Sequence, residues 1–90
     1  MAGIEHRIKV WPGVFDAIAG GRKTCEYRNL AGRAFEVGDF VVGMEYDPET
    51  RDYTGHEYRR RISWIDVGPD FGIRDGYCVL SLAPEEPNDA

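Results

Sequence analysis

The sequence predicts a small α+β domain, mostly β, in which one or two short helices accompany a mixed β-barrel. Period-two alternation of apolar and polar residues recurs in several segments, whereas helical spacing is clear in only one. The order is one strand, one helix, and then four or five strands. This chain of 90 residues has room for a single core. Because one helix is too few for a doubly wound sheet, a small mixed barrel is the economical arrangement.

A strand over residues 6–10 leads into a helix that begins near Pro12. Proline suits the first helical turn, where its missing N–H costs nothing. We expect Trp11 to anchor the helix start by packing, and the alternative is an aromatic platform for a base. His6 is expected to be satisfied by backbone groups at the strand end. Four apolar residues at helical spacing predict the buried stripe, namely Val14, Phe15, Ile18 and Ala19.

A polar strand follows the glycine pair at 20–21, because glycine readily adopts the left-handed conformation that ends a helix. Lys23 stands at the entry to this strand. Alternation indicates one polar face and one core face. The expected polar face carries Thr24, Glu26 and Arg28, and the expected core face carries Cys25 and Tyr27.

The second half of the chain reads as strands joined by hairpins and loops. In order, we expect a central strand at 40–46, a polar hairpin tip at 47–52, a returning strand at 56–67, a loop at 68–76 and a last buried strand at 77–82. Gly43 in the central strand indicates a bulge or a close approach. The loop is a candidate lid or specificity loop with Phe71 exposed. On the returning strand, alternation places Tyr58, Ile62 and Trp64 on one face.

Three consecutive arginines in the returning strand suggest contact with phosphate. Arg59 and Arg61 share a face, while Arg60 lies among aromatic residues and must snorkel or pair with a carboxylate. We expect ion pairs across the hairpin, with Glu45 or Glu49, in preference to phosphate contact.

Composition limits the classes of function. A net charge of −5 argues against a protein that coats nucleic acid by bulk attraction, so a nucleic-acid role must be local. We expect one domain over residues 1–83 and a disordered acidic tail over 84–90. No segment resembles a membrane span or a signal peptide, which predicts a cytoplasmic protein. We also expect a monomer or a weak dimer. Cys25 and Cys78 are expected to be buried thiols, and neither a metal site nor a cofactor is predicted.

The polar strand also carries a family resemblance. Gly21, Lys23, Glu26 and Arg28 match the G-x-K-x-x-E-x-R signature of ASCH domains, which are relatives of PUA-like RNA-binding barrels. Over roughly residues 6–82 the chain resembles a short, uncharacterised bacterial and phage branch of that group. The resemblance implies a PUA-like barrel in which Lys23, Glu26 and Arg28 project into a cleft.

Three functions stay open. In the first, a module binds RNA, a nucleotide or a nucleoside. Lys23 and Arg28 then contact phosphate or a base edge, and Glu26 accepts a hydrogen bond from a base or fixes Arg28. An aromatic residue stacks the base, for which Trp11 is the candidate, and further cations are Arg22 and Arg61.

In the second, a hydrolase uses Lys23 to activate a nucleophile while a carboxylate shuttles the proton. Some ASCH relatives resemble amidohydrolases that act on acylated pyrimidine nucleosides, with threonine at the position of Glu26. Here Thr24 lies two positions earlier, roughly 6.5 Å away along a strand. A ribonuclease using Lys23, Glu26 and a histidine is a variant of this hypothesis.

In the third, an acidic phage-type protein binds a host protein, its carboxylates mimicking phosphates. The purely structural alternative is that Glu26 and Arg28 form a pair that only orients the strand.

Overall fold

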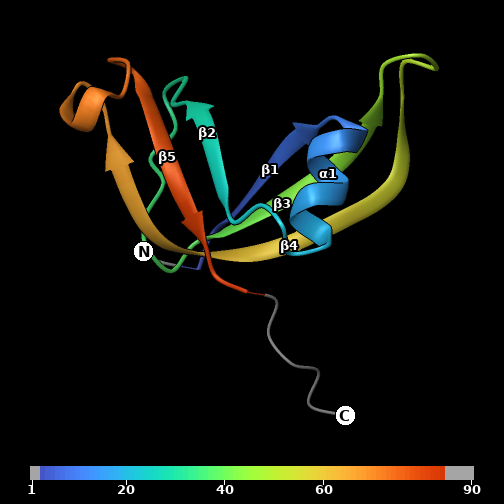
Figure 1. Cartoon of the computed structure of the whole chain (residues 1–90), viewed down its shortest axis with the longest axis horizontal. Coiled ribbons are helices and arrows are strands. Elements are labelled where there is room, and N and C mark those ends of the chain that lie inside the picture. Colours follow the sequence, from blue (N-terminus) through green and yellow to red (C-terminus); the bar gives the residue numbers. More distant parts are fainter. Residues whose placement is uncertain (1–2, 85–90) are drawn as a thin grey trace, which may run out of the picture.

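A five-stranded mixed sheet organises the fold, in the strand order β1-β3-β4-β5-β2 (Figure 1). The computed structural model describes residues 3–84. β1 runs parallel to β3, and the other neighbours are antiparallel. The elements are β1 (Glu5–Val10), α1 (Pro12–Ala19), β2 (Cys25–Asn29), β3 (Phe40–Asp47), β4 (Asp52–Val67), the 3-10 helix η1 (Asp70–Gly72) and β5 (Tyr77–Leu82). The predicted mostly-β α+β domain with one or two short helices is confirmed.

The long strand β4 joins two wings of the sheet. Its first part pairs with β3 and its second part with β5, and the register shifts between Ile62 and Trp64. The sheet bends along β4, so that β2 and β5 stand opposite β1, β3 and α1 (Figure 1). Among the described residues β1 and β2 are the two edges of the sheet.

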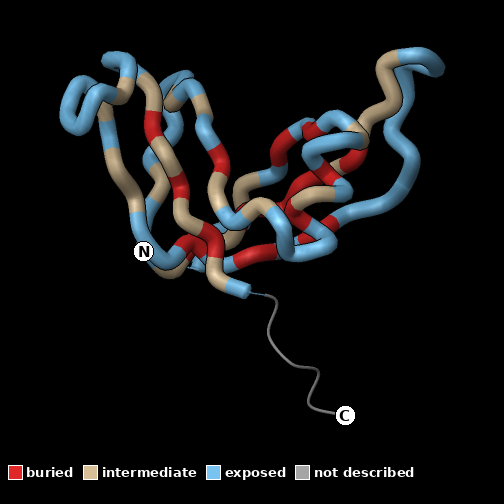
Figure 2. The backbone as a smooth tube through the Cα atoms, in the orientation of Figure 1, coloured by how far each residue is buried: buried red, intermediate tan, exposed pale blue. Residues whose placement is uncertain are grey.

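The core lies on the inner side of this bend and between the sheet and α1 (Figure 2). It includes residues from four strands and the helix, since β1, β3, β4 and β5 all contribute apolar side chains. Burying one such side chain fully contributes about 1.5–3 kcal/mol. The buried cluster consists of Ile8, Val10, Phe15, Ile18, Val41, Tyr58, Ile62, Cys78, Leu80 and Leu82.

Helix α1 begins at Pro12 as predicted, but its buried stripe is narrower than expected. Phe15 and Ile18 are buried, whereas Val14 and Ala19 are exposed. The helix is only eight residues long and rests on β3 and β4 along two positions one turn apart. A two-residue contact leaves the flanking positions outside the core.

The C-terminal end of α1 is held by Arg60 of β4. The Arg60 guanidinium donates hydrogen bonds to the backbone carbonyls of Ile18 (3.3 Å) and Ala19 (3.5 Å). These carbonyls belong to the last helical turn, where a cation is favourable, and the Ile18 carbonyl also accepts a hydrogen bond from Gly21 N at 3.1 Å. Arg60 therefore fixes the helix against the sheet while itself remaining buried.

The predicted grouping of Glu26 with Arg28 on one face of β2 is correct, but the prediction that Cys25 and Tyr27 form the core face is wrong. Thr24 is exposed and precedes the strand, while Glu26 is buried and Arg28 is half-buried. Tyr27 is exposed and Cys25 is only half-buried, although Cys78 is buried as expected. The polar face is itself the inner face, because the bend of the sheet directs it towards the concave interior.

Trp64 is also exposed, contrary to the prediction from alternation. The register shift between Ile62 and Trp64 inserts an irregularity, and the residues beyond it no longer continue the face of Tyr58 and Ile62. Period-two alternation fails wherever a strand contains such a bulge. Of the predicted tail, residues 85–90 lie outside the described part of the chain.

Asp39 connects the N-terminal segment to the start of β3. Its buried carboxylate accepts hydrogen bonds from the backbone N–H groups of Gly3 (3.0 Å), Ile4 (3.2 Å) and Glu36 (3.0 Å). It also lies 2.8 Å from His6 Nε2, so His6 is satisfied by a carboxylate and not by backbone groups as expected. Burial alone would raise the pKa of Asp39, but these hydrogen bonds and the charge of His6 together lower it.

Candidate functional site

Glu26 and Arg28 reach the interior because β2 pairs with β5. Glu26 lies opposite Leu80 and Arg28 opposite Cys78, and both β5 residues are fully buried. Arg28 Nη1 donates a hydrogen bond to Glu26 Oε1 at 3.3 Å. The predicted pair therefore exists, and it is set into the inner wall of the bent sheet.

The Glu26 carboxylate is only 5% exposed, and its protonation reflects this. Burial raises the pKa of Glu26, while the charges of Arg28 and Lys23 act in the opposite direction without cancelling the effect. At neutral pH the ionised and protonated forms of Glu26 are thus closer in free energy than the two forms of an exposed glutamate. Such a group can accept a hydrogen bond or, when protonated, donate one.

A small cavity opens beside this pair, between the edge strands β1 and β2. We call it the seam pocket. Its volume is about 140 Å³, and it is lined by Lys9, Val10, Trp11, Val14, Glu26 and Arg28. A water molecule occupies about 30 Å³ and drug-sized ligands need roughly 300–1,000 Å³, so the pocket suits one small ring or polar group of a larger ligand.

Trp11 stands at the mouth of the seam pocket and is 59% exposed. We expected Trp11 to anchor the helix start by packing, either in the core or against the helix, and core packing is therefore wrong. The residue follows β1 with extended backbone and caps α1 without a side-chain hydrogen bond, so its indole remains outside the core. An exposed indole beside a guanidinium and a carboxylate offers stacking, cationic and hydrogen-bonding groups at one place.

Tyr58 contributes a buried hydroxyl to the same interior region. Within residues 3–84 this hydroxyl has no hydrogen-bond partner. Burial and the charge of Glu26 raise the pKa of Tyr58, while Arg28 and Arg60 oppose the shift. The Tyr58 ring covers Gly43, where a Cβ atom would lie 2.1 Å from the ring. Gly43 therefore marks the close approach that the sequence indicated.

Lys23 and Thr24 lie at a neighbouring cavity and do not line the seam pocket. This second cavity, of about 290 Å³, is found beside the end of α1 and the end of β5. Lys23 Nζ lies 3.7 Å from Cys25 Sγ. Lys23 still lowers the pKa of Glu26 through its charge, although the two residues line different cavities.

Two further candidate residues lie away from the seam pocket. Arg22 is exposed in the turn after α1. Arg61 is exposed, and its guanidinium lies 4.9 Å from the centre of the Phe40 ring. The arginine run does form an ion pair, but Arg59 Nε pairs at 2.7 Å with Glu5 of β1 and not with the examples expected across the hairpin, Glu45 or Glu49.

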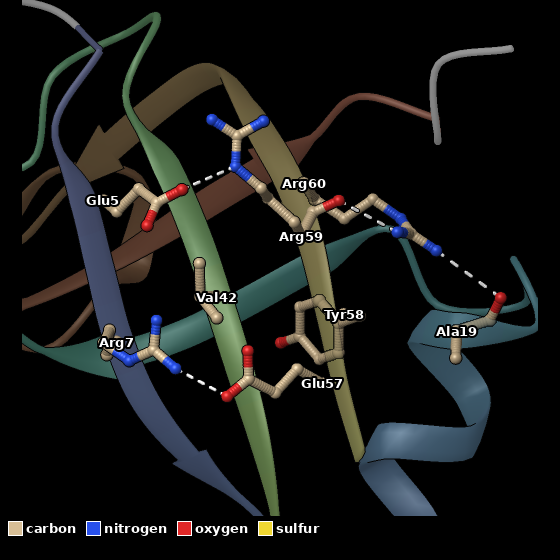
Figure 3. A pocket seen from close by; sticks show the side chains of 8 residues that line it. All are labelled: Glu5, Arg7, Ala19, Val42, Glu57, Tyr58, Arg59 and Arg60. Carbon is tan, nitrogen blue, oxygen red and sulfur yellow. Dashed lines mark hydrogen bonds and ion pairs between the residues drawn. The ribbon is translucent and has the colours of Figure 1, made fainter. Parts of the chain in front are cut away.

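A larger cavity, of about 420 Å³, is a different site (Figure 3). Its charged groups already have partners within the chain, since Arg59 pairs with Glu5 and Arg7 Nη2 lies 2.5 Å from Glu57 Oε2. A ligand would have to break these pairs. The lining residues are Glu5, Arg7, Ala19, Val42, Glu57, Tyr58, Arg59 and Arg60. The seam pocket is the better candidate because it adds an exposed indole, Trp11, and a second cation, Lys9, to its ion pair.

Sequence reasoning missed Tyr58, Lys9 and Val14 as members or neighbours of the site. Gly43 was the available signal for Tyr58, because a glycine in a buried strand indicates a large group on its neighbour. Lys9 gave no signal, since it alternates outward on β1 like any solvated lysine. Its ammonium group lies 4.5 Å from the centre of the Tyr46 ring.

Within residues 3–84 no helix is long and apolar enough to cross a membrane, and no three histidine, cysteine or acidic side chains gather as metal ligands would. No curated protein matches the chain. A family model described as a domain of unknown function, DUF3850, matches residues 5–82, from the first residue of β1 to the last of β5. The chain therefore belongs to the DUF3850 family.

Proposed function

We propose that this protein binds a nucleotide or a segment of single-stranded RNA at the seam pocket. One observation carries the proposal. The fold brings Trp11, Glu26 and Arg28 to a single small cavity between two unpaired sheet edges, although Trp11 lies far from the other two in sequence. An aromatic face, a buried carboxylate and a guanidinium are the groups with which proteins stack a base, accept from its amino group and hold phosphate.

Each of the three residues has a distinct role. The exposed face of Trp11 stacks on the base, a contact that is worth about 1–3 kcal/mol. Glu26 accepts a hydrogen bond from an exocyclic amino group that enters the cavity. Arg28, whose side chain is about one-third exposed, holds phosphate or the base edge while it keeps Glu26 in place. The volume of about 140 Å³ limits entry to one ring edge, so sugar and phosphate stay outside.

The net charge of −5 is compatible with this role because only a few contacts are needed. The seam pocket carries two cations, Lys9 and Arg28, against one carboxylate, Glu26. Its local charge is therefore opposite to that of the whole chain. An acidic remainder disfavours non-specific binding, so that affinity depends on the pocket itself.

Hydrolysis is the second candidate function, and the raised pKa of Glu26 favours it. A carboxyl group whose pKa is raised by burial is a candidate general acid or base. Lys23 and Thr24, however, line a different cavity from Glu26. The separation of these groups supports binding over turnover. Mass spectrometry of incubated nucleosides and acylated pyrimidine nucleosides distinguishes the two functions.

The binding proposal is tested by following melting temperature and affinity with nucleoside monophosphates and short RNAs. Trp11→Ala should abolish a ligand-induced rise in melting temperature. Trp64→Ala is the matched control, because Trp64 is 61% exposed against 59% for Trp11 and lies outside the pocket. Equal loss of binding in both variants, or no effect of Trp11→Ala and Arg28→Ala, would contradict the proposal.

A further inference from the structure

Another cavity, distinct from the one at Lys23, adjoins the seam pocket and shares Arg28 with it. We call it the loop pocket. Its volume is about 360 Å³, and it is formed by the end of β2 and the connection that follows, with Tyr27, Arg28, Asn29, Ala31, Arg33 and Phe35 as its lining. Arg28 thus forms the boundary between a cavity of one-ring size and a cavity that is large enough for a whole nucleotide.

The loop pocket repeats the chemistry of the seam pocket. Tyr27 is 50% exposed, and its ring stacks on Tyr77 with 5.3 Å between centroids and 20° between planes. This support leaves the other face of Tyr27 available to a base. Arg33 makes one long hydrogen bond, 3.4 Å to the carbonyl of Arg7, and forms no ion pair with the described residues. Its charge is available to an anion.

The backbone of the loop pocket is held in an unusual conformation. Ala31 has φ of 48° and Gly32 has φ of 79°, so two consecutive residues are left-handed. The Asn29 side chain accepts a hydrogen bond from Ala31 N at 2.9 Å, and Arg33 N donates to the Leu30 carbonyl at 2.7 Å. A left-handed alanine costs about 1 kcal/mol or more, so the two hydrogen bonds of the loop must offset this strain for the conformation to persist.

We infer that the two pockets together bind two consecutive nucleotides of a single strand. The base of the first enters the seam pocket beside Trp11, Arg28 holds the phosphate between them, and the second base stacks on Tyr27 with Arg33 at the next phosphate. The inference rests on the proposed function and specifies its ligand as an oligonucleotide. Across both pockets three cations, Lys9, Arg28 and Arg33, face one carboxylate, Glu26.

The test compares a nucleoside 5′-monophosphate with a dinucleotide and a tetranucleotide that contain the same base, using calorimetry. The wild type should bind the dinucleotide about 5- to 150-fold more tightly than the monophosphate, which is the worth of one stacked base. Tyr27→Ala should remove this gain and leave the affinity for the monophosphate unchanged. Tyr27→Phe should retain the gain, because it keeps the ring.

Tyr53→Ala is the control for loss of an exposed tyrosine. Tyr53 is also 50% exposed and packs against another tyrosine, but it lies in the β3–β4 hairpin. Arg33→Ala should reduce the dependence of tetranucleotide affinity on salt by about 0.7 in the logarithmic slope, as expected for one lost phosphate on a single strand, because the phosphate after the second base is present in the tetranucleotide. Ribose and deoxyribose forms of the dinucleotide identify the source of the strand.

The outcomes separate the two proposals. Binding of the monophosphate that depends on Trp11, with no further gain from a second nucleotide, would overturn the two-pocket inference and leave the seam pocket intact. A gain that survives Tyr27→Ala and Arg33→Ala would also overturn it. If the wild-type protein did not bind the monophosphate at all, the result would instead contradict the proposed function.

Discussion

The replacement of Tyr58 by phenylalanine should stabilise this protein, which is the opposite of the usual result for a buried tyrosine. A buried hydroxyl with a partner contributes about 0.5–1.5 kcal/mol to stability. The Tyr58 hydroxyl is buried and has no partner among residues 3–84. Its transfer from water without a replacement hydrogen bond costs about 1–3 kcal/mol. Tyr58→Phe keeps the ring over Gly43 and removes this cost.

Urea unfolding at neutral pH measures the effect. A gain of about 1 kcal/mol also corresponds to a rise of about 4–8 °C in melting temperature for a domain of this size. The denaturant slope should stay constant, since the surface exposed on unfolding is the same. Tyr46→Phe, in the half-buried part of β3, is the control and should change stability by less than about 0.5 kcal/mol. A Tyr58→Phe protein that is clearly less stable would show that the hydroxyl is hydrogen-bonded in the free protein.

Three other changes test the frame of the site. Asp39→Ala should destabilise the fold by about 3 kcal/mol or more, because it leaves three backbone N–H groups unpaired. The control is Asp47→Ala, which removes one exposed hydrogen bond in a turn and should cost about 1 kcal/mol or less in urea unfolding. Because the pKa of Asp39 is lowered, its contribution is present above its unfolded pKa and is lost as pH falls through the native value, which a stability profile below pH ~4 should show. Gly43→Ala should cost about 1–3 kcal/mol by overpacking, since its Cβ would lie 2.1 Å from the buried Tyr58 ring; an unchanged melting temperature would count against that packing. For Glu26 the sign is reversed, because its raised native pKa means that ionisation costs stability as pH rises above ~4.5. Glu26→Gln should therefore become more stable relative to wild type as the pH rises from acid to neutral. A stability difference that stays constant with pH would contradict the raised pKa of Glu26.

Sequence patterns predicted the fold where local chemistry determines it. Pro12 marked the start of α1, and alternation located β1, whose Ile8 and Val10 are buried on one face. Gly43 indicated a close approach, which the Tyr58 ring explains. These signals depend only on residues near one another in the chain or on a neighbouring strand.

The errors arise where tertiary geometry decides. Trp64 lies beyond a register shift that its residue type does not encode. Trp11 looks like a core residue by composition, yet it is exposed because the sheet edges at β1 and β2 leave a seam beside it. The signature residues were identified as a group, but the structure separates Lys23 from Glu26 and Arg28, since the turn before β2 directs Lys23 to a different cavity.

The central claim is that a nucleotide binds beside Trp11, and the two tryptophans of the chain allow one direct measurement. Each indole N–H gives its own signal in a nitrogen-proton NMR spectrum during titration with a nucleoside monophosphate. The Trp64 signal is a built-in reference, because Trp64 Nε1 donates to Asp66 at 3.1 Å away from the pocket. A shift of the Trp11 signal that saturates while Trp64 stays constant is the predicted result. Equal movement of both signals, movement of Trp64 alone, or no movement at millimolar ligand would contradict the seam pocket as a nucleotide site.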